Sequence, residues 1–216
     1  MKKSILILGA GGHARVCADA IQAAGGNVTA FLETDDSLVG KAILGIPIIG
    51  QNMALENGER DQTELIIGIG SAGRFDSLAR RQEISANLAA KGWSIGGVRH
   101  PSAIISSTAN VAFDAQLMAR SVVQPQATIG SGAIINTAAV VEHDAVVGDG
   151  SHVSIGAILG GNVTLGRNVF VGAGGIVRQG VVIGDNVVIG AGATVIRNQQ
   201  FATTLVGVPA RELSTR

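Results

Sequence analysis

Two histidines stand in a segment built mostly from Gly, Ala, Val and Ile, VEHDAVVGDGSHVSIGA at residues 141–157. Carboxylates flank the first of them, because Glu142 precedes His143 and Asp144 follows it. A carboxylate beside an imidazole raises the basicity of the ring and fixes its tautomer, which suits a general base. An exposed histidine is by default only a solvated polar side chain, but these neighbours favour proton transfer. His143 is therefore a candidate base, and His152, nine residues later, is a second residue of interest.

A six-residue repeat holds both histidines. From Ile105 to Val195, every sixth residue is Ile, Leu or Val, at sixteen positions without a slip. This period fits neither an α-helix nor a simple alternating strand, but it is typical of the hexapeptide parallel β-helix, in which three hexads close one triangular coil. The aliphatic residue points inward, and Gly, Asn and Asp supply the turns. We therefore predict an uninterrupted prism of a little over five coils, from which no long loop departs.

The repeat also predicts where the two histidines lie. His143 is the third residue of the hexad VEHDAV, at a turn, so its side chain should project outward between Pro125 and Gly161, which lie one coil away and leave room. Asn136, seven residues earlier, adds a polar neighbour. His152 lies half a coil on, at a different side of the prism, so one cleft can hold both histidines only where two prisms pack side by side. We therefore predict an oligomer, and from the triangular shape a homotrimer, with its sites between subunits.

A metal site is the alternative use of such histidines. A catalytic zinc ion needs three protein ligands and one open position. Only two of the four histidines lie within the repeat, because His100 precedes it and His13 stands in a glycine-rich loop. We therefore expect no metal.

The first half of the chain alternates strand and helix patterns, which predicts a parallel sheet. We expect a Rossmann-like α/β domain over residues 1–100 and the β-helix over residues 101–216. The predicted strands are Ser4–Leu8, Asn27–Glu33 and Leu65–Gly70, and the predicted helices are 14–25 and 73–91.

The loop GAGGHA at Gly9–Ala14 approximates a dinucleotide fingerprint, and Glu33 lies near the distance expected of a ribose-binding acid. A nicotinamide-dependent dehydrogenase is therefore a rival interpretation. The residues before the repeat are, however, too few for two mononucleotide-binding halves and a substrate domain. We prefer a site at which the backbone N–H groups of the helix start receive a polar or anionic ligand. A purely structural glycine turn is the simpler alternative.

Composition narrows the partners. The 16 Lys and Arg residues balance the 16 Asp and Glu residues, which argues against nucleic acid or an anionic membrane held by bulk charge. The single cysteine, Cys17, allows no internal disulfide and suits a reducing compartment. The apolar run Ile5–Leu8 is too short for a signal peptide, and no apolar stretch is long enough to span a membrane. We therefore expect a cytoplasmic protein.

The GAGGHA start, joined to a repeat that carries NTAAVVEHDAVVGDGSHVSIGA, resembles the NeuD/PglD-type sugar acetyltransferases, which are left-handed β-helix acyltransferases. The resemblance covers nearly the whole chain. It implies transfer from acetyl-CoA to the amino group of a nucleotide-linked 4-amino-4,6-dideoxy sugar, in polysaccharide or glycan biosynthesis. O-acetylation of sialic acid is the alternative within the family, and a non-catalytic β-helix scaffold is the alternative outside it.

The resemblance also implies roles for individual residues. His143 matches the catalytic base, and Asp144 matches its supporting acid, with Glu142 as the alternative support. His152 matches a residue that touches acetyl-CoA, and Arg211 in the closing GVPAR could meet a phosphate of the coenzyme. The implied sugar-nucleotide site comprises Gly11, Gly12, His13, Glu33, Thr34, Gly70, Ser71 and Ala72. The family often carries two aspartates where this chain has Glu33 and Thr34, so the nucleotide stays open.

The backbones of Ala173 and Ala191 match positions that line the long arm of the coenzyme. Together with Ile155 they stand at eighteen-residue steps, so they form one column along the prism. A column of mostly small residues is a smooth groove that suits pantetheine. We expect the α/β domain to present the sugar and the β-helix of a neighbouring subunit to present acetyl-CoA. We expect no acyl-enzyme, because the only thiol, Cys17, lies on the first predicted helix.

Overall fold

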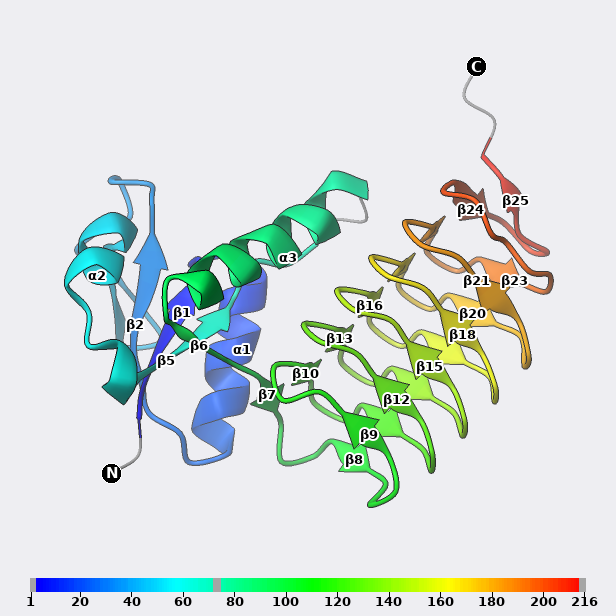
Figure 1. Cartoon of the computed structure of the whole chain (residues 1–216), viewed down its shortest axis with the longest axis horizontal. Coiled ribbons are helices and arrows are strands. Elements are labelled where there is room, and N and C mark those ends of the chain that lie inside the picture. Colours follow the sequence, from blue (N-terminus) through cyan, green and yellow to red (C-terminus); the bar gives the residue numbers. More distant parts are fainter. Residues whose placement is uncertain (1–2, 72–74, 214–216) are drawn as a thin grey trace.

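The computed structural model describes residues 3–71 and 75–213. An α/β domain packs against one end of a long three-sided prism (Figure 1). Of the residues named above, Ala72 and the first two residues of the predicted helix 73–91 lie outside the described ranges. None of the helices within these ranges is long and apolar enough to cross a membrane.

The α/β domain is built on a six-stranded sheet with the strand order β3-β4-β2-β1-β5-β6. Every neighbouring pair is parallel except β3 and β4, which form an antiparallel hairpin. The first strand, SILIL, lies near the middle of the sheet, and its Ile7 and Leu8 are buried. The strands are β1 (Ser4–Leu8), β2 (Val28–Glu33), β3 (Ala42–Ile43), β4 (Ile46–Gly50), β5 (Thr63–Ile67) and β6 (Ser94–Gly96).

Three α-helices and one 3-10 turn connect these strands: α1 (Gly12–Ala23), α2 (Gln51–Asn57), the turn Arg60–Gln62 and α3 (Phe75–Ala90). Helix α1 forms because small and aliphatic residues recur along one face, which the sheet buries. It ends where Gly25 adopts a left-handed φ of 73° and Gly26 donates its N–H to Ile21 O at 2.8 Å. The sequence predicted α1, α3 and three of the six strands, but not the hairpin, α2 or β6.

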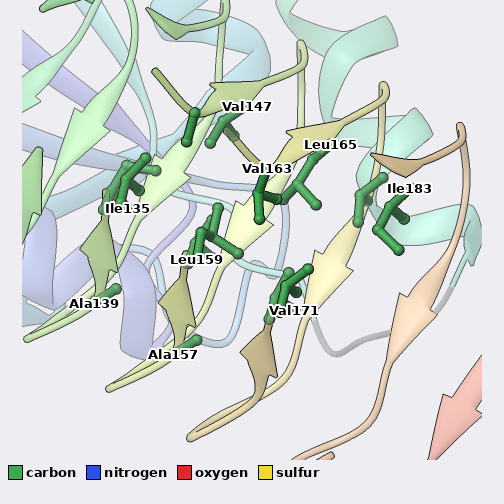
Figure 2. Packing of buried hydrophobic residues seen from close by; sticks show 14 of the residues in the cluster. Ile135, Ala139, Val147, Ala157, Leu159, Val163, Leu165, Val171 and Ile183 are labelled. Atoms are coloured by element: carbon green, nitrogen blue, oxygen red, sulfur yellow. The ribbon is translucent and has the colours of Figure 1, made fainter. Parts of the chain in front are cut away.

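The second half is a left-handed β-helix: the repeat predicted a parallel β-helix, and the family resemblance implied its hand. Each strand pairs in parallel with the strand one coil later, for example Ile134 with His152 and Val140 with Ile158. Of the sixteen aliphatic positions of the repeat, the fourteen from Leu117 to Val195 are at most 3% exposed, and the first two are partly buried. Figure 2 shows some of these side chains inside the coils, among them Ile135, Val147, Leu159, Leu165, Val171 and Ile183. The repeat runs without a long loop from the first of these positions to the last.

The strands form three faces. The junction face comprises β7 (Val98–Arg99), β10 (Gln116–Leu117), β13 (Ile134–Ile135), β16 (His152–Val153), β19 (Phe170–Val171), β22 (Val188–Ile189), β24 (Thr204–Val206) and the antiparallel β25 (Arg211–Glu212). The aliphatic face comprises β8 (Ile104–Ile105), β11 (Val122–Val123), β14 (Val140–Val141), β17 (Ile158–Leu159), β20 (Ile176–Val177) and β23 (Thr194–Val195). The third face comprises β9 (Asn110–Val111), β12 (Thr128–Ile129), β15 (Val146–Val147), β18 (Thr164–Leu165) and β21 (Val182–Ile183).

The α/β domain packs on the junction face. Val98 and Met118 of the prism belong to the same buried cluster as the face of α1. Polar contacts reinforce this packing, because Gln116 donates its Nε2–H to Ile67 O at 2.9 Å and the Arg81 guanidinium donates to Gly132 O. The strand β7 already pairs with β10, so prism geometry begins at Val98.

Candidate functional site

His143 and Asp144 occupy a turn that leads from the aliphatic face to the third face. The Nδ1 atom of His143 lies 2.7 Å from Oδ2 of Asp144, and both side chains are about half exposed, at 49% and 48%. Asp144 adopts a left-handed φ of 59° and donates its N–H to Pro125 O at 3.1 Å, which fixes the turn. Since the carboxylate holds Nδ1, Nε2 is the ring atom free to take a proton from a ligand.

The other flanking carboxylate has a different partner. Glu142 accepts the backbone N–H of His143 through Oε2 at 3.3 Å, so it contacts the main chain and not the ring. One coil later, Gly161 lies against the imidazole, because a Cβ at this glycine would stand 2.6 Å from both Cε1 and Nε2. The His143 ring can therefore occupy this position only because residue 161 has no side chain.

His152 has a quite different environment. It lies on β16 of the junction face and is only 4% exposed. Its Nδ1 is 2.6 Å from Oγ of Ser71, its Nε2 is 3.0 Å from Nδ2 of Asn136, and its ring meets the edge of Phe170 at 5.3 Å between centroids. Burial, together with the positive charges of His13, when protonated, and of Arg81, lowers the pKa of His152 to about 3. Both nitrogens are engaged, so the contact of His152 with acetyl-CoA stays a prediction.

Asn136 thus lies against His152, and its prediction as a polar neighbour of His143 was wrong. The reason is geometric: residues 136–139 form the turn between β13 and β14, and residues 142–145 form the next turn around the coil. Within one chain, His143 and His152 stand at different sides of the prism.

A cavity of about 620 Å³ opens at the carboxyl end of the parallel sheet. It gathers all the described residues that were predicted to receive the sugar nucleotide, together with Gln51 and Arg80, which the sequence did not single out. The predicted residues that line it are Gly11, Gly12, His13, Glu33, Thr34, Gly70 and Ser71. Strand ends of a parallel sheet meet at one edge, which explains why segments far apart in the sequence converge here.

The glycine loop presents backbone donors to this cavity. Helix α1 begins at Gly12 without a side-chain cap, and a Cβ at Gly11 or Gly12 would meet nothing within 4 Å. The first N–H groups of the helix are therefore open to a ligand, and they favour an anion. Glu33 holds the loop in place, because its Oε2 accepts the N–H of Ala10 at 3.2 Å while its Oε1 accepts that of Thr34 at 2.8 Å.

His13 lines the same cavity and reaches across to the prism. Its Nε2 lies 2.7 Å from Oε1 of Gln116, a residue 1% exposed on β10, and 3.6 Å from the buried Sγ of Cys17. Burial lowers the pKa of His13 to about 4, Arg81 adds to this effect, and the hydrogen bond to Gln116 opposes it. Gln116 was not predicted, and the only signal for it in the sequence is a polar residue beside an inward position of the repeat.

The column Ile155, Ala173 and Ala191 runs along the edge between the junction face and the aliphatic face, as the spacing predicted. Gly156, Gly174 and Gly192, the next residues in these turns, donate N–H groups at 2.9 Å to carbonyls one coil earlier. Within the described ranges, the N–H groups of the column residues themselves have no partner. On another edge, by contrast, the equivalent N–H of Arg167 is capped by Asp185 Oδ1 at 2.8 Å.

Arg211 lies on the exposed strand β25 and donates Nη1–H to the carbonyl of Ala210 at 2.9 Å. Within residues 3–71 and 75–213, no group of three or more His, Cys, Asp and Glu side chains is arranged to hold a metal ion.

Comparisons with known proteins agree with this arrangement. The family described as "PglD N-terminal domain" matches residues 4–82. The acetyltransferase domain of PglB from Neisseria gonorrhoeae is 33% identical, with a TM-score of 0.88 over 98% of this chain and 100% of that one. PerB from Caulobacter crescentus, solved with CoA and GDP-perosamine, is 32% identical, with a TM-score of 0.89 over 98% of this chain and 97% of that one.

WeeI from Acinetobacter baumannii, at 16% identity and a TM-score of 0.64 over 98% of this chain and 100% of that one, shares the fold. A comparison with curated proteins found no match. The identity and coverage of the PglB and PerB structures extend the likeness over both halves of the chain, beyond the N-terminal match. The chain therefore belongs to the NeuD/PglD-type family of sugar acetyltransferases.

Proposed function

We propose that this protein transfers the acetyl group of acetyl-CoA to the amino group of a nucleotide-linked 4-amino-4,6-dideoxy sugar, with His143 as the general base. The observation that carries the proposal is the pairing of His143 Nδ1 with Asp144 Oδ2 at 2.7 Å on an exposed turn. The carboxylate stabilises the imidazolium that forms when Nε2 accepts a proton.

The transfer is a direct attack. The neutral amine of the sugar forms a bond to the thioester carbonyl carbon, and Nε2 of His143 takes the proton that the nitrogen loses. The C–S bond then breaks, and CoA leaves as the thiolate, which the protonated His143 or water neutralises. Holding both reactants in one site supplies much of the rate.

The cavity at the end of the parallel sheet supports the sugar-nucleotide part of the proposal. Its volume of about 620 Å³ lies in the range of small-molecule sites. The uncapped start of α1 offers N–H groups to the phosphates. Among the similar structures, PerB was solved with GDP-perosamine, which is a nucleotide-linked amino sugar.

The column Ile155, Ala173 and Ala191 supports the coenzyme part. Its residues leave backbone N–H groups open at three successive coils, which lie about 4.8 Å apart. The amide carbonyls of pantetheine are the natural acceptors for such donors. The structures solved with acetyl-CoA or CoA include the PglB domain and PerB.

A neighbouring subunit completes the site. The column runs along one edge of the aliphatic face, and His143 stands on the other edge of the same face, so one chain cannot bring them together. The outward residues of this face form an apolar stripe, in which Ile104, Ile158 and Ile176 are 65%, 41% and 40% exposed. Three copies with this face toward a common axis bury the stripe and set the column of one subunit beside His143 of the next, with acetyl-CoA between them.

The burial of the Cys17 thiol supports acetyl transfer without an acyl-enzyme intermediate. Cys17 is fully buried on α1, and burial raises its pKa to about 12. A protonated thiol that solvent does not reach is a poor nucleophile.

The test is acetyl transfer from acetyl-CoA to a panel of UDP-, dTDP- and GDP-linked 4-amino-4,6-dideoxy sugars, with sialic acid and an NAD reduction assay alongside. His143→Ala should lower kcat by about two to four orders of magnitude, with KM values little changed. His100→Ala, which removes a histidine from the first turn of the prism, is the matched control and should keep kcat. Transfer to sialic acid alone, or a wild-type kcat in His143→Ala, would contradict the proposal.

A further inference from the structure

Two chains of hydrogen bonds cross the junction between the α/β domain and the prism, and each contains one buried histidine. One chain joins Ser71, His152 and Asn136, and the other joins His13, Gln116 and Ile67. Ser71 and His13 line the cavity at the end of the sheet, whereas Asn136 and Gln116 belong to the prism. The direction of each chain follows from backbone groups that can act in only one way.

The first chain begins at a backbone N–H, which can only donate. The N–H of Thr137 donates to Oδ1 of Asn136 at 2.8 Å, so the Asn136 amide must turn its Nδ2 toward His152. Nδ2 is also only a donor, so Nε2 of His152 must accept. The proton of the neutral His152 ring is therefore on Nδ1, from which it is donated to Ser71 Oγ at 2.6 Å. Because Ser71 Oγ accepts this bond, its own O–H is left to donate to a ligand.

The second chain begins at a backbone carbonyl, which can only accept. Nε2 of Gln116 donates to Ile67 O at 2.9 Å, so Oε1 of Gln116 faces His13. Nε2 of His13, at 2.7 Å from Oε1, must then carry the proton of the neutral ring. The remaining ring nitrogen, Nδ1, is an acceptor, and within the described ranges it has no partner. His13 therefore offers its ligand a lone pair.

From these two chains we infer that Asn136 and Gln116 are positioning residues, which set the tautomers of His152 and His13 so that the cavity presents one donor, Ser71 O–H, and one acceptor, His13 Nδ1. The two groups line one cavity, and the rings of His13 and His152 lie 6.4 Å apart between centroids, so the pair fits a substituent that both accepts and donates a hydrogen bond, a hydroxyl group or a neutral amine of the sugar. It rejects a hydrogen or a methyl group at that place, because both polar groups would lose their partner. This inference rests on the proposed function for the identity of its ligand.

Isotope-edited NMR of protein labelled with ¹⁵N-histidine tests the tautomers without any substrate. Long-range ¹H–¹⁵N spectra distinguish a ring protonated on Nδ1 from one protonated on Nε2, and His152→Gln and His13→Gln assign the signals. We expect the Nδ1–H form for His152 and the Nε2–H form for His13 between pH 6 and 8. The proposal is overturned if either ring carries its proton on the opposite nitrogen or on both.

Kinetics test whether the donor reaches the sugar. Ser71→Ala should raise KM for the sugar nucleotide that is turned over by about 10-fold, with KM for acetyl-CoA unchanged. In Asn136→Asp a carboxylate can only accept, so His152 must place a proton on Nε2, and at alkaline pH, where the ring is neutral, Ser71 must then donate to Nδ1. The sugar loses the same donor, so we expect a similar rise in KM and no further rise when the two substitutions are combined.

Asn110→Asp makes the same chemical change on the exposed third face and should leave both KM values unaltered. Wild-type KM in Ser71→Ala, or an additive rise in the double variant, would refute the donor role. If no nucleotide amino sugar is acetylated at all, the proposed function fails, whereas the tautomer assignment still stands or falls on the spectra. Deoxy analogues of the active substrate identify the group recognised, because its loss should weaken binding to wild type but not to Ser71→Ala.

Discussion

Gly161→Ala offers a test of the base that leaves the base itself in place. Gly161 lies in the turn one coil beyond His143, and its missing side chain gives the imidazole its room. An added Cβ would stand 2.6 Å from Cε1 and Nε2 and 3.2 Å from Cδ2 of His143. The first two atoms form the outward edge of the ring, where the proton is accepted in the proposed reaction.

The size of the effect follows from this contact. Nonbonded carbon atoms settle at about 3.5–4.0 Å, so the ring must retreat by roughly 1 Å. Gly161 is not in the left-handed region, so alanine suits its backbone and the turn should persist. A displacement of about 1 Å costs on the order of 10²-fold in rate, so kcat should fall by about 100-fold while both KM values stay near those of wild type.

Steady-state kinetics of acetyl transfer measure this effect, and circular dichroism checks the fold. The control is Gly50→Ala, because a Cβ at Gly50 meets nothing within 4 Å. In a His143→Ala background the Gly161 substitution should have no further effect, since the ring that it displaces is gone. An unaltered kcat in Gly161→Ala, or a second large loss in the double variant, would refute the reasoning.

Three further predictions concern stability, assembly and the thiol. His13 and His152 have pKa values of about 4 and 3 in the folded chain, whereas the unfolded chain protonates them near 6.5, so the unfolded state binds more protons and the free energy of unfolding should fall by about 2 kcal/mol per histidine from pH 7 to pH 5. The urea midpoints at pH 7 and pH 5 measure this fall, and the difference between them should be smaller in His152→Gln. Equal midpoints of the wild-type protein at the two pH values would contradict the prediction. Ile158→Lys on the aliphatic face should dissociate the oligomer in light scattering, whereas Val182→Lys, equally exposed on the third face, should not; a trimer that tolerates the first change excludes this face as the interface. Cys17→Ala should keep kcat within about threefold, and a mass increase of an acetyl group on the wild-type protein would instead indicate an acyl-enzyme.

The repeat could be predicted from the sequence because each hexad repeats the same local physics. A side chain such as Val141 or Leu159 points inward for the same reason as its neighbours one coil away, so sixteen weak signals in register make one strong one. The glycine loop after β1 could also be predicted, because a strand, a Gly-rich turn and a helix start are consecutive in the chain. The hairpin β3–β4 and the short α2 carry no such repetition, so they could not be predicted from the sequence.

The contacts at the junction lay beyond sequence reasoning. His13 and Gln116 are separated by 103 residues, and Ser71 and His152 by 81, so only the docking of the α/β domain on the junction face unites them. The spacing of His143 and His152 correctly implied different sides of the prism, but it could not tell that one side is solvent and the other a domain boundary. Asn136 was assigned to His143 and not to His152 for the same reason, because the sequence does not show which side of the prism the α/β domain covers.

The two environments explain why one imidazole of this site suits proton transfer and two do not. A base must take a proton near neutral pH, so it needs water or a carboxylate to stabilise the cation, and His143 has both through its exposed turn and Asp144. Burial, with the nearby Arg81 cation adding to it, lowers the pKa values of His13 and His152 to about 4 and 3 and keeps both rings neutral. A neutral imidazole with a fixed tautomer is a dependable donor or acceptor at any pH at which the protein works. In the trimer proposed above, the prism would therefore separate the two tasks by geometry, with proton transfer on the exposed edge of one subunit and recognition of the sugar at the buried junction of the next.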